Sequence, residues 1–110
     1  MKSPGHISIA QALERLEAAD GKRSIALFEH GTLTVKMYAP RAIDAQQPHT
    51  QDEIYVVAAG SGKFDLNGSR ELCEIGDVLF APAGTSHKFV DFTGDFAVWV
   101  FFYGPEGGER

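Results

Sequence analysis

The first strongly patterned stretch of the chain is apolar at helical spacing. Its apolar residues recur every three or four positions, at Ile9, Ala12, Leu13 and Leu16. Ser8 precedes this stretch and Gln11 follows three residues later, which is the sequence of a capping box. The pattern predicts one short amphipathic helix over about residues 8–18, ending near Gly21.

Beyond Gly21 the helical period is lost, and short runs of β-branched and aromatic residues alternate with turn residues. These runs predict strands near residues 24–29, 32–39, 52–58, 62–66, 70–74, 77–81, 86–92 and 96–103. Asn67-Gly68 is the strongest hairpin signal, because both residues tolerate the positive φ of a type I′ turn. Many short strands that do not alternate with helices predict an all-β sandwich or barrel rather than a doubly wound α/β fold. The Gly-rich, charged segment 104–110 is predicted to be a frayed tail.

The last predicted strand is apolar on both faces. Residues 96–103 read Phe-Ala-Val-Trp-Val-Phe-Phe-Tyr, whereas a half-solvated strand alternates with polar residues. Either both faces are covered within the chain, or one face meets another subunit. We predict a homodimer from this pattern.

Length and charge narrow the class of protein. A chain of 110 residues fits a single domain over residues 1–110. The net charge is −5, and no basic cluster is longer than Lys22-Arg23, which argues against nucleic-acid partners and anionic membrane surfaces. The sequence has one cysteine, Cys73, so no intrachain disulfide can form. The N-terminus lacks a long apolar run, so we expect neither a signal peptide nor a membrane span, and a cytoplasmic location.

One polar segment leads directly into the third predicted strand. Alternate side chains of an extended strand share a face, which here would group Gln47, His49, Gln51 and Glu53. Tyr55 continues that face into apolar sequence. The segment therefore predicts a pocket with a polar mouth and a packed floor.

A second segment, residues 76–87, ends a strand in the turn Pro82-Ala83-Gly84 and places His87 at the start of the next strand. If the two segments are neighbours in a barrel, His87 would meet His49 and Glu53. Two imidazoles and one carboxylate form a facial ligand set with open positions, which suits Fe(II), Mn(II) or Zn(II).

The first segment resembles the first motif of the cupin superfamily. That motif is Gly, five residues, His-any-His, three or four residues, Glu, six residues, Gly. His49 takes the place of the second His, Glu53 that of the Glu and Gly60 that of the closing Gly. The chain departs from the motif at Gln47, where the first His belongs, and at Arg41, where the opening Gly belongs.

The second segment resembles the second cupin motif, which is Gly, five residues, Pro-any-Gly, two residues, His, three residues, Asn. The residues that match its spacing are Gly76, Pro82, Gly84 and His87. Asp91 stands where the Asn belongs. The resemblance covers about residues 25–103 and is greatest to small single-domain cupins. It implies a double-stranded β-helix (jelly-roll) barrel, a metal in the barrel cavity and often a dimer.

The resemblance and the ligand set together suggest a metal-binding cupin. We expect a metal-dependent enzyme of oxygenase or isomerase type that acts on a small organic molecule, with one divalent ion (Fe, Mn, Zn or Ni). The alternative is a non-catalytic module that binds a small molecule. Gln47 could be a fourth ligand through its carbonyl oxygen, or hydrogen-bond a bound water. Tyr55, Phe80 and Phe101 are candidates for the substrate pocket, although each also fits a packed core.

Overall fold

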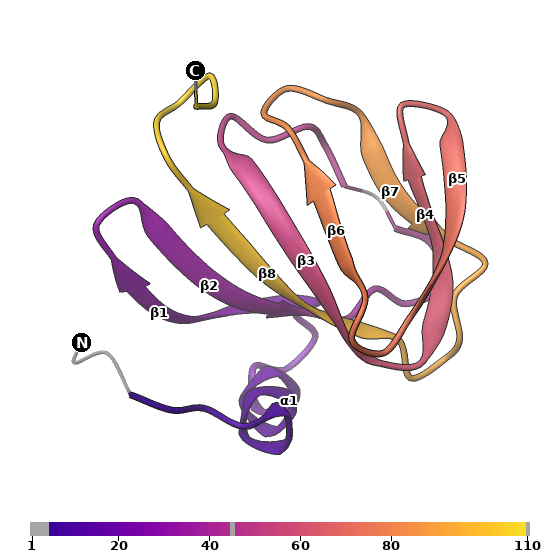
Figure 1. Cartoon of the computed structure of the whole chain (residues 1–110). Coiled ribbons are helices and arrows are strands. Elements are labelled where there is room, and N and C mark those ends of the chain that lie inside the picture. Colours follow the sequence, from indigo (N-terminus) through magenta and orange to yellow (C-terminus); the bar gives the residue numbers. More distant parts are fainter. Residues whose placement is uncertain (1–4, 45, 110) are drawn as a thin grey trace.

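The computed structural model describes residues 5–44 and 46–109 (Figure 1). Its elements are α1 (Ile9–Ala18), β1 (Ser24–His30), β2 (Leu33–Tyr38), β3 (Asp52–Ala59), β4 (Ser61–Leu66), β5 (Ser69–Glu74), β6 (Val78–Ala81), β7 (His87–Val90) and β8 (Ala97–Tyr103). The predicted helix and strands agree with these bounds to within two residues.

The strands form two antiparallel sheets. One sheet has five strands in the order β1-β2-β8-β3-β6, and the other has three in the order β5-β4-β7. The small sheet stands across from the β8-β3-β6 side of the large one (Figure 1). The all-β barrel class predicted from the sequence is therefore confirmed. The large sheet has an inner face toward the small sheet and an outer face that α1 partly covers.

Helix α1 begins as the sequence predicts. The Ser8 hydroxyl accepts from the Gln11 backbone N–H at 3.0 Å, and the Gln11 side chain accepts from the Ser8 N–H at 2.8 Å. Ala12 and Leu16 are the buried residues of the helix, and they join Leu27 in a cluster on the outer face of the large sheet. Within the described part of the chain, no helix has the length and apolar character needed to cross a membrane.

The hairpin between β4 and β5 is the two-residue turn that was predicted. Leu66 pairs with Ser69 across it. Asn67 has a φ of 52° and Gly68 a φ of 92°, so both central residues are in the left-handed region that a type I′ turn requires.

Aromatic side chains fill the space between the sheets. The ring of Phe89 lies 5.1 Å from that of Tyr55, 5.2 Å from that of Phe64 and 4.9 Å from that of Phe96, measured between centroids. All four side chains are buried. Each contributes about 1.5–3 kcal/mol through burial, and the edge-on and tilted contacts between rings add to this. This core is the floor on which the candidate site rests.

Strand β8 explains the apolar run of residues 96–103. Val98, Val100 and Phe102 face the inner core, whereas Trp99 and Phe101 pack with the outer cluster. The strand lies between β2 and β3 inside the large sheet. Both faces are thus partly covered by the chain itself, which accounts for the lack of alternation.

The prediction of a frayed C-terminal tail is wrong for residues 104–109. The N–H of Gly104 donates to the Thr32 hydroxyl at 3.0 Å, and that of Gly107 donates to the Thr50 carbonyl at 2.7 Å. The N–H of Glu109 donates to a carboxylate oxygen of Asp52 at 2.9 Å. The Gly-rich composition predicted a frayed end, but backbone N–H groups of this segment donate to Thr32, Thr50 and Asp52.

Candidate metal centre

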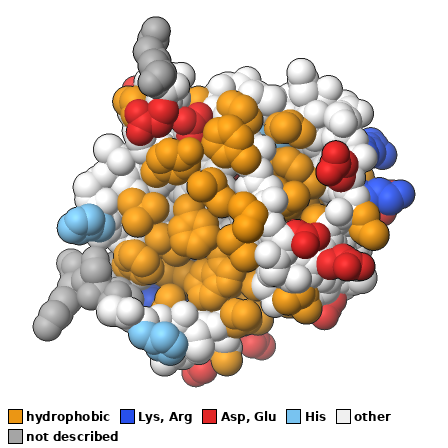
Figure 2. Space-filling model, viewed as in Figure 1, with side chains coloured by type: hydrophobic (Ala, Val, Ile, Leu, Met, Phe, Trp, Pro, Cys, Tyr) orange, Lys and Arg blue, Asp and Glu red, His pale blue; other side chains and the backbone are white. Residues whose placement is uncertain are grey.

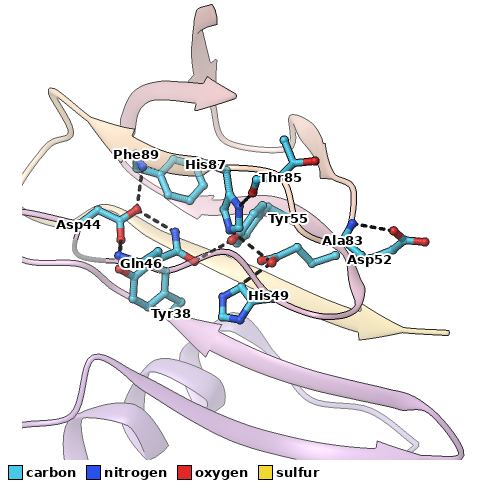
Figure 3. A network of polar contacts seen from close by, with 11 residues as sticks. Tyr38, Asp44, Gln46, His49, Asp52, Tyr55, Ala83, Thr85, His87 and Phe89 are labelled. Carbon is cyan, nitrogen blue, oxygen red and sulfur yellow. Dashed lines mark hydrogen bonds and ion pairs between the residues drawn. The ribbon is translucent and has the colours of Figure 1, made fainter. Parts of the chain in front are cut away.

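Three side chains predicted to act together do gather in the structure (Figure 3). Glu53 comes from β3. His87, which begins β7, and His49, which lies in the loop before β3, are labelled in Figure 3. The Oε2 atom of Glu53 is 3.3 Å from Nε2 of His87 and 3.7 Å from Nε2 of His49. The ligand atoms of all three residues lie within 4.8 Å of one another.

Backbone contacts bring the two motif segments together. The N–H of Gly84 donates to the His49 carbonyl at 2.8 Å, and that of Ala83 donates to Asp52 at 2.9 Å. Strand pairing also sets Glu53 opposite Ala81, just before the turn. Gly84 has a φ of 76°, which a residue without Cβ adopts readily. The turn that precedes His87 is thereby attached to the segment that carries His49 and Glu53.

The buried donor atoms fit a cation. The side chains of Glu53 and His87 are each 1% exposed, yet Glu53 Oε1 and His87 Nε2 have no hydrogen-bond partner. Nδ1 of His87 lies 2.8 Å from the Thr85 carbonyl. Because a carbonyl only accepts, Nδ1 carries a proton, which leaves Nε2 as the atom that a cation would bind when the ring is neutral. Buried polar atoms without partners are costly unless something binds them, and a divalent ion would satisfy both.

The surroundings of His87 favour its protonated form. Burial lowers the pKa of His87, but Glu53, the Thr85 carbonyl and Asp44 together outweigh burial and raise that pKa above its ordinary value. Protons would therefore compete with a cation for Nε2, and a metal bound here would be held less tightly as the pH falls.

A buried polar network lies behind the three ligands (Figure 3). The Tyr55 hydroxyl donates to Gln46 Oε1 at 2.8 Å, and Gln46 Nε2 donates to Asp44 Oδ2 at 2.8 Å. Asp44 also accepts from the Tyr38 hydroxyl and, at 2.7 Å, from the backbone N–H of Phe89. Burial, then the nearby Glu53 carboxylate, raises the pKa of Tyr55 far above its ordinary value. The Tyr55 hydroxyl therefore stays protonated and acts as a donor.

The sequence pattern misses two members of this network. Asp44 and Gln46 lie in the loop before β3, where no strand alternation applies. Gln47, the predicted fourth ligand, is exposed, while its neighbour Gln46 points toward Tyr55. The role of Gln47 as a fourth ligand therefore stays a prediction. The alternation that would have aligned it with His49 begins only at Asp52, the first residue of β3.

Two of the three predicted pocket aromatics lie on the other side of the large sheet. Phe101 and Phe80 both pair with Ile54, so these side chains share the outer face. Their placement in the cavity is corrected accordingly. Tyr55 faces inward as predicted, and the aromatic ring beside the site is that of Phe102, whose centroid is 4.9 Å from that of His49.

The arrangement has the form of a facial two-His-one-carboxylate site. Such a set holds a first-row divalent ion on one side and leaves the other side for substrate. His49 is the most accessible of the three ligands, with 37% of its side chain exposed. A small molecule would approach the centre from the side of His49.

Comparisons with known proteins agree with this fold and site. The family model of the cupin domain matches residues 34–103. An uncharacterized protein of Streptomyces coelicolor is 33% identical over 96 residues, covering 86% of this chain and 91% of that protein. An acireductone dioxygenase of Frankia alni is 40% identical over 68 residues, covering 57% of this chain. The chain matches only 33% of the length of that dioxygenase.

Solved structures show the same architecture. The crystal structure of a cupin-2 domain protein from Shewanella frigidimarina superimposes with a TM-score of 0.66 at 13% identity, covering 84% of this chain and 92% of that one. The region that matches the cupin family model, residues 34–103, contains all three residues of the candidate metal centre. On the family model, the Streptomyces relative and the shared architecture, this chain belongs to the cupin family.

Proposed function

We propose that this cupin is a metal-dependent enzyme, of oxygenase or isomerase type, that acts on a small organic molecule. His49, Glu53 and His87 would hold one divalent ion, Fe, Mn, Zn or Ni. The observation that carries the proposal is a pair of buried atoms without a hydrogen-bond partner, Glu53 Oε1 and His87 Nε2; the second of them faces the Glu53 carboxylate at 3.3 Å. The similarity to acireductone dioxygenases, named for a reaction with dioxygen, supports the oxygenase version.

The bound ion would supply Lewis acidity or, as iron, activation of dioxygen. The chain supplies orientation. The Thr85 carbonyl fixes the tautomer of His87. Phe102 forms an apolar wall beside His49. The protonated Tyr55 hydroxyl donates its hydrogen to Gln46, so it can accept a hydrogen bond from a ligand but does not remove a proton.

The test of the ligand set is metal content. The protein is purified without a metal-binding tag, and metals are measured by mass spectrometry in wild type and in a His49→Ala/His87→Ala double variant. The matched control is His6→Ala/His30→Ala, because both of those histidines are exposed. We expect close to one ion per chain in wild type and in the control, and loss of the ion in the double variant. Metal that is equally low in all three proteins would refute the proposal.

A non-catalytic binding module remains the second candidate. The observation that favours it is the raised pKa of Tyr55, which removes one potential base from the cavity. Oxygen uptake and product analysis with metal-loaded protein and small diols, thiols and keto-acids separate the two. Binding without turnover across these substrates would support the module.

We also propose that the chain forms a homodimer through the outer face of the large sheet. Two register rows of apolar side chains cross this face; they are Phe28, Val35, Phe101, Ile54 and Phe80, and Ile25, Met37, Trp99, Val56 and Val78. Val35 and Met37 are buried within the chain, and the other members of the rows are at least partly exposed. Figure 2 shows the resulting apolar surface, with most charged side chains around it. Its β6 edge is open, since Val78 is 67% and Phe80 46% exposed.

The dimer is tested by the mass of the particle in solution. Val78→Lys should convert a dimer into a monomer in size-exclusion chromatography with light scattering. Leu72→Lys is the matched control, because Leu72 is 65% exposed but belongs to the small sheet. A monomeric wild type, or a dimer that survives Val78→Lys, would contradict the proposal.

A further inference from the structure

A lysine lies on the inner, site-bearing face of the large sheet. Lys36 of β2 pairs with Val100 of β8, and Val100 pairs with Tyr55 of β3. Because paired residues share a face, Lys36 points to the same side as Tyr55, two strands away. That separation is about 10 Å, since adjacent strands lie about 4.8 Å apart. Lys36 thus stands on the inner face beyond the part that the small sheet covers, at the margin of the candidate site.

The ammonium of Lys36 and the ligand His49 both contact the ring of Phe102. Its Nζ lies 5.9 Å from the centroid of the Phe102 ring, and the other contact of that ring is with His49, at 4.9 Å between centroids. Phe102 therefore separates the cation from the metal ligand. The side chain of Lys36 is half-buried, with its ammonium over the face of the Phe102 ring.

A cavity of about 130 Å³ joins these groups. The described residues that line it are Ser24, Lys36, Tyr38, Gln46, His49, Val100 and Phe102. At about 30 Å³ per water molecule, it has room for roughly four waters or one small organic molecule. His49 is the member of the metal centre that it touches, so a ligand in this cavity lies beside the proposed ion.

The polar groups of the cavity leave one strong donor for a ligand. The Tyr38 hydroxyl is committed to Asp44. The Gln46 amide donates to Asp44 and accepts from Tyr55. Lys36 lines the cavity, and its charge favours an anionic acceptor over a neutral one by forming charge-assisted hydrogen bonds.

We propose that the cavity binds a small carboxylate, with the carboxylate group on Lys36 and the rest of the molecule toward His49. This inference rests on the proposed function, because it names the class of substrate that the metal centre would take. Lys36 is then the residue that selects an acid over its uncharged analogue. Phe102 sets the distance between the anchored carboxylate and the reacting end.

The test compares lactate with lactamide, which have similar size and differ in charge. Binding is measured by saturation-transfer NMR with metal-free protein, and by relaxation of the ligand methyl protons with Mn(II)-loaded protein. The variants are Lys36→Gln and Lys36→Arg. Lys63→Gln is the control, because Lys63 is an exposed lysine of the small sheet, next to Asp91.

We expect wild type to bind lactate at least tenfold more tightly than lactamide. Lys36→Gln should remove that preference, Lys36→Arg should retain much of it and Lys63→Gln should leave it unchanged. Equal binding of the two ligands to wild type, or a preference for lactate that survives Lys36→Gln, would overturn the inference. Lactate that binds through Lys36 without any Mn(II) relaxation effect would support this inference and count against the proposed metal centre alone.

Discussion

Replacing the buried Asp44 carboxylate by an amide is the most informative single change in this protein. Oδ1 of Asp44 accepts from the Tyr38 hydroxyl and, at 3.2 Å, from the Gln46 N–H. Oδ2 accepts from Gln46 Nε2 at 2.8 Å and from the Phe89 N–H at 2.7 Å. In Asp44→Asn, whichever oxygen becomes the NH₂ group, two donors lose their acceptor and face another donor.

The size of the effect follows from that count. Hydrogen bonds to a charged group contribute about 1.5–3 kcal/mol each, so two of them correspond to a loss of about 3–6 kcal/mol. A small domain has only about 5–15 kcal/mol of unfolding free energy in total. Asp44→Asn should therefore bring the protein close to unfolding at room temperature, although the change is isosteric.

The assay is urea unfolding followed by the fluorescence of Trp99. Tyr38→Phe removes one donor while Oδ1 keeps the Gln46 N–H, so it should cost about 1.5 kcal/mol and gives a measurable value if Asp44→Asn does not fold. The control is Asp91→Asn, since Asp91 is exposed and Asn tolerates its φ of 50°. A loss below about 1 kcal/mol for Asp44→Asn would refute the account of this network.

Two further changes test the turn after β3 and the electrostatics of the small sheet. A Cβ at Gly60, whose φ is +68°, would clash with the Thr93 side chain, whereas Gly31, with a φ of +59°, has open space around it. Gly60→Ala should therefore lower the free energy of unfolding, measured in urea, by more than Gly31→Ala does. Equal losses of unfolding free energy would contradict the steric argument. The hydrogen bond from Arg70 lowers the pKa of Asp65 below its ordinary value, so the stabilisation by this carboxylate is complete above the unfolded-state pKa and is lost as the pH falls through the folded-state pKa. The stability difference between wild type and Asp65→Asn should shrink between pH 7 and pH 2.5, and a difference independent of pH would show that the charge has no role.

Local patterns in the sequence were sufficient wherever the chain is regular. The capping box predicts the start of α1, and Asn67-Gly68 predicts the β4–β5 turn, because both signals depend on neighbouring residues alone. Motif spacing predicts which residues, His49, Glu53 and His87, come together. That prediction requires the two segments to be adjacent in a barrel. The number of short strands and the resemblance to cupins together predicted such a barrel.

Side-chain direction in irregular or doubly covered segments could not be predicted. The loop before β3 has no period, so nothing in the sequence distinguishes Gln46 from Gln47. In β8 both faces are apolar, so the sequence does not show whether Phe101 or Phe102 faces the site. The pairing of Phe102 with Glu53 decides this. Asp44 gave no signal, because its partners lie on three separate segments of the chain.

The backbone links between the two motif segments have a consequence for how this protein would exchange metals. The contacts from Gly84 to His49 and from Ala83 to Asp52 use no atom that would bind an ion. Folding itself therefore sets the spacing of the three side chains, so the entropic cost of ordering them would not have to be met when an ion binds. Different first-row ions would then compete for one preformed frame, with the outcome decided by their availability. The ion held at the proposed centre would then follow the metals supplied during growth.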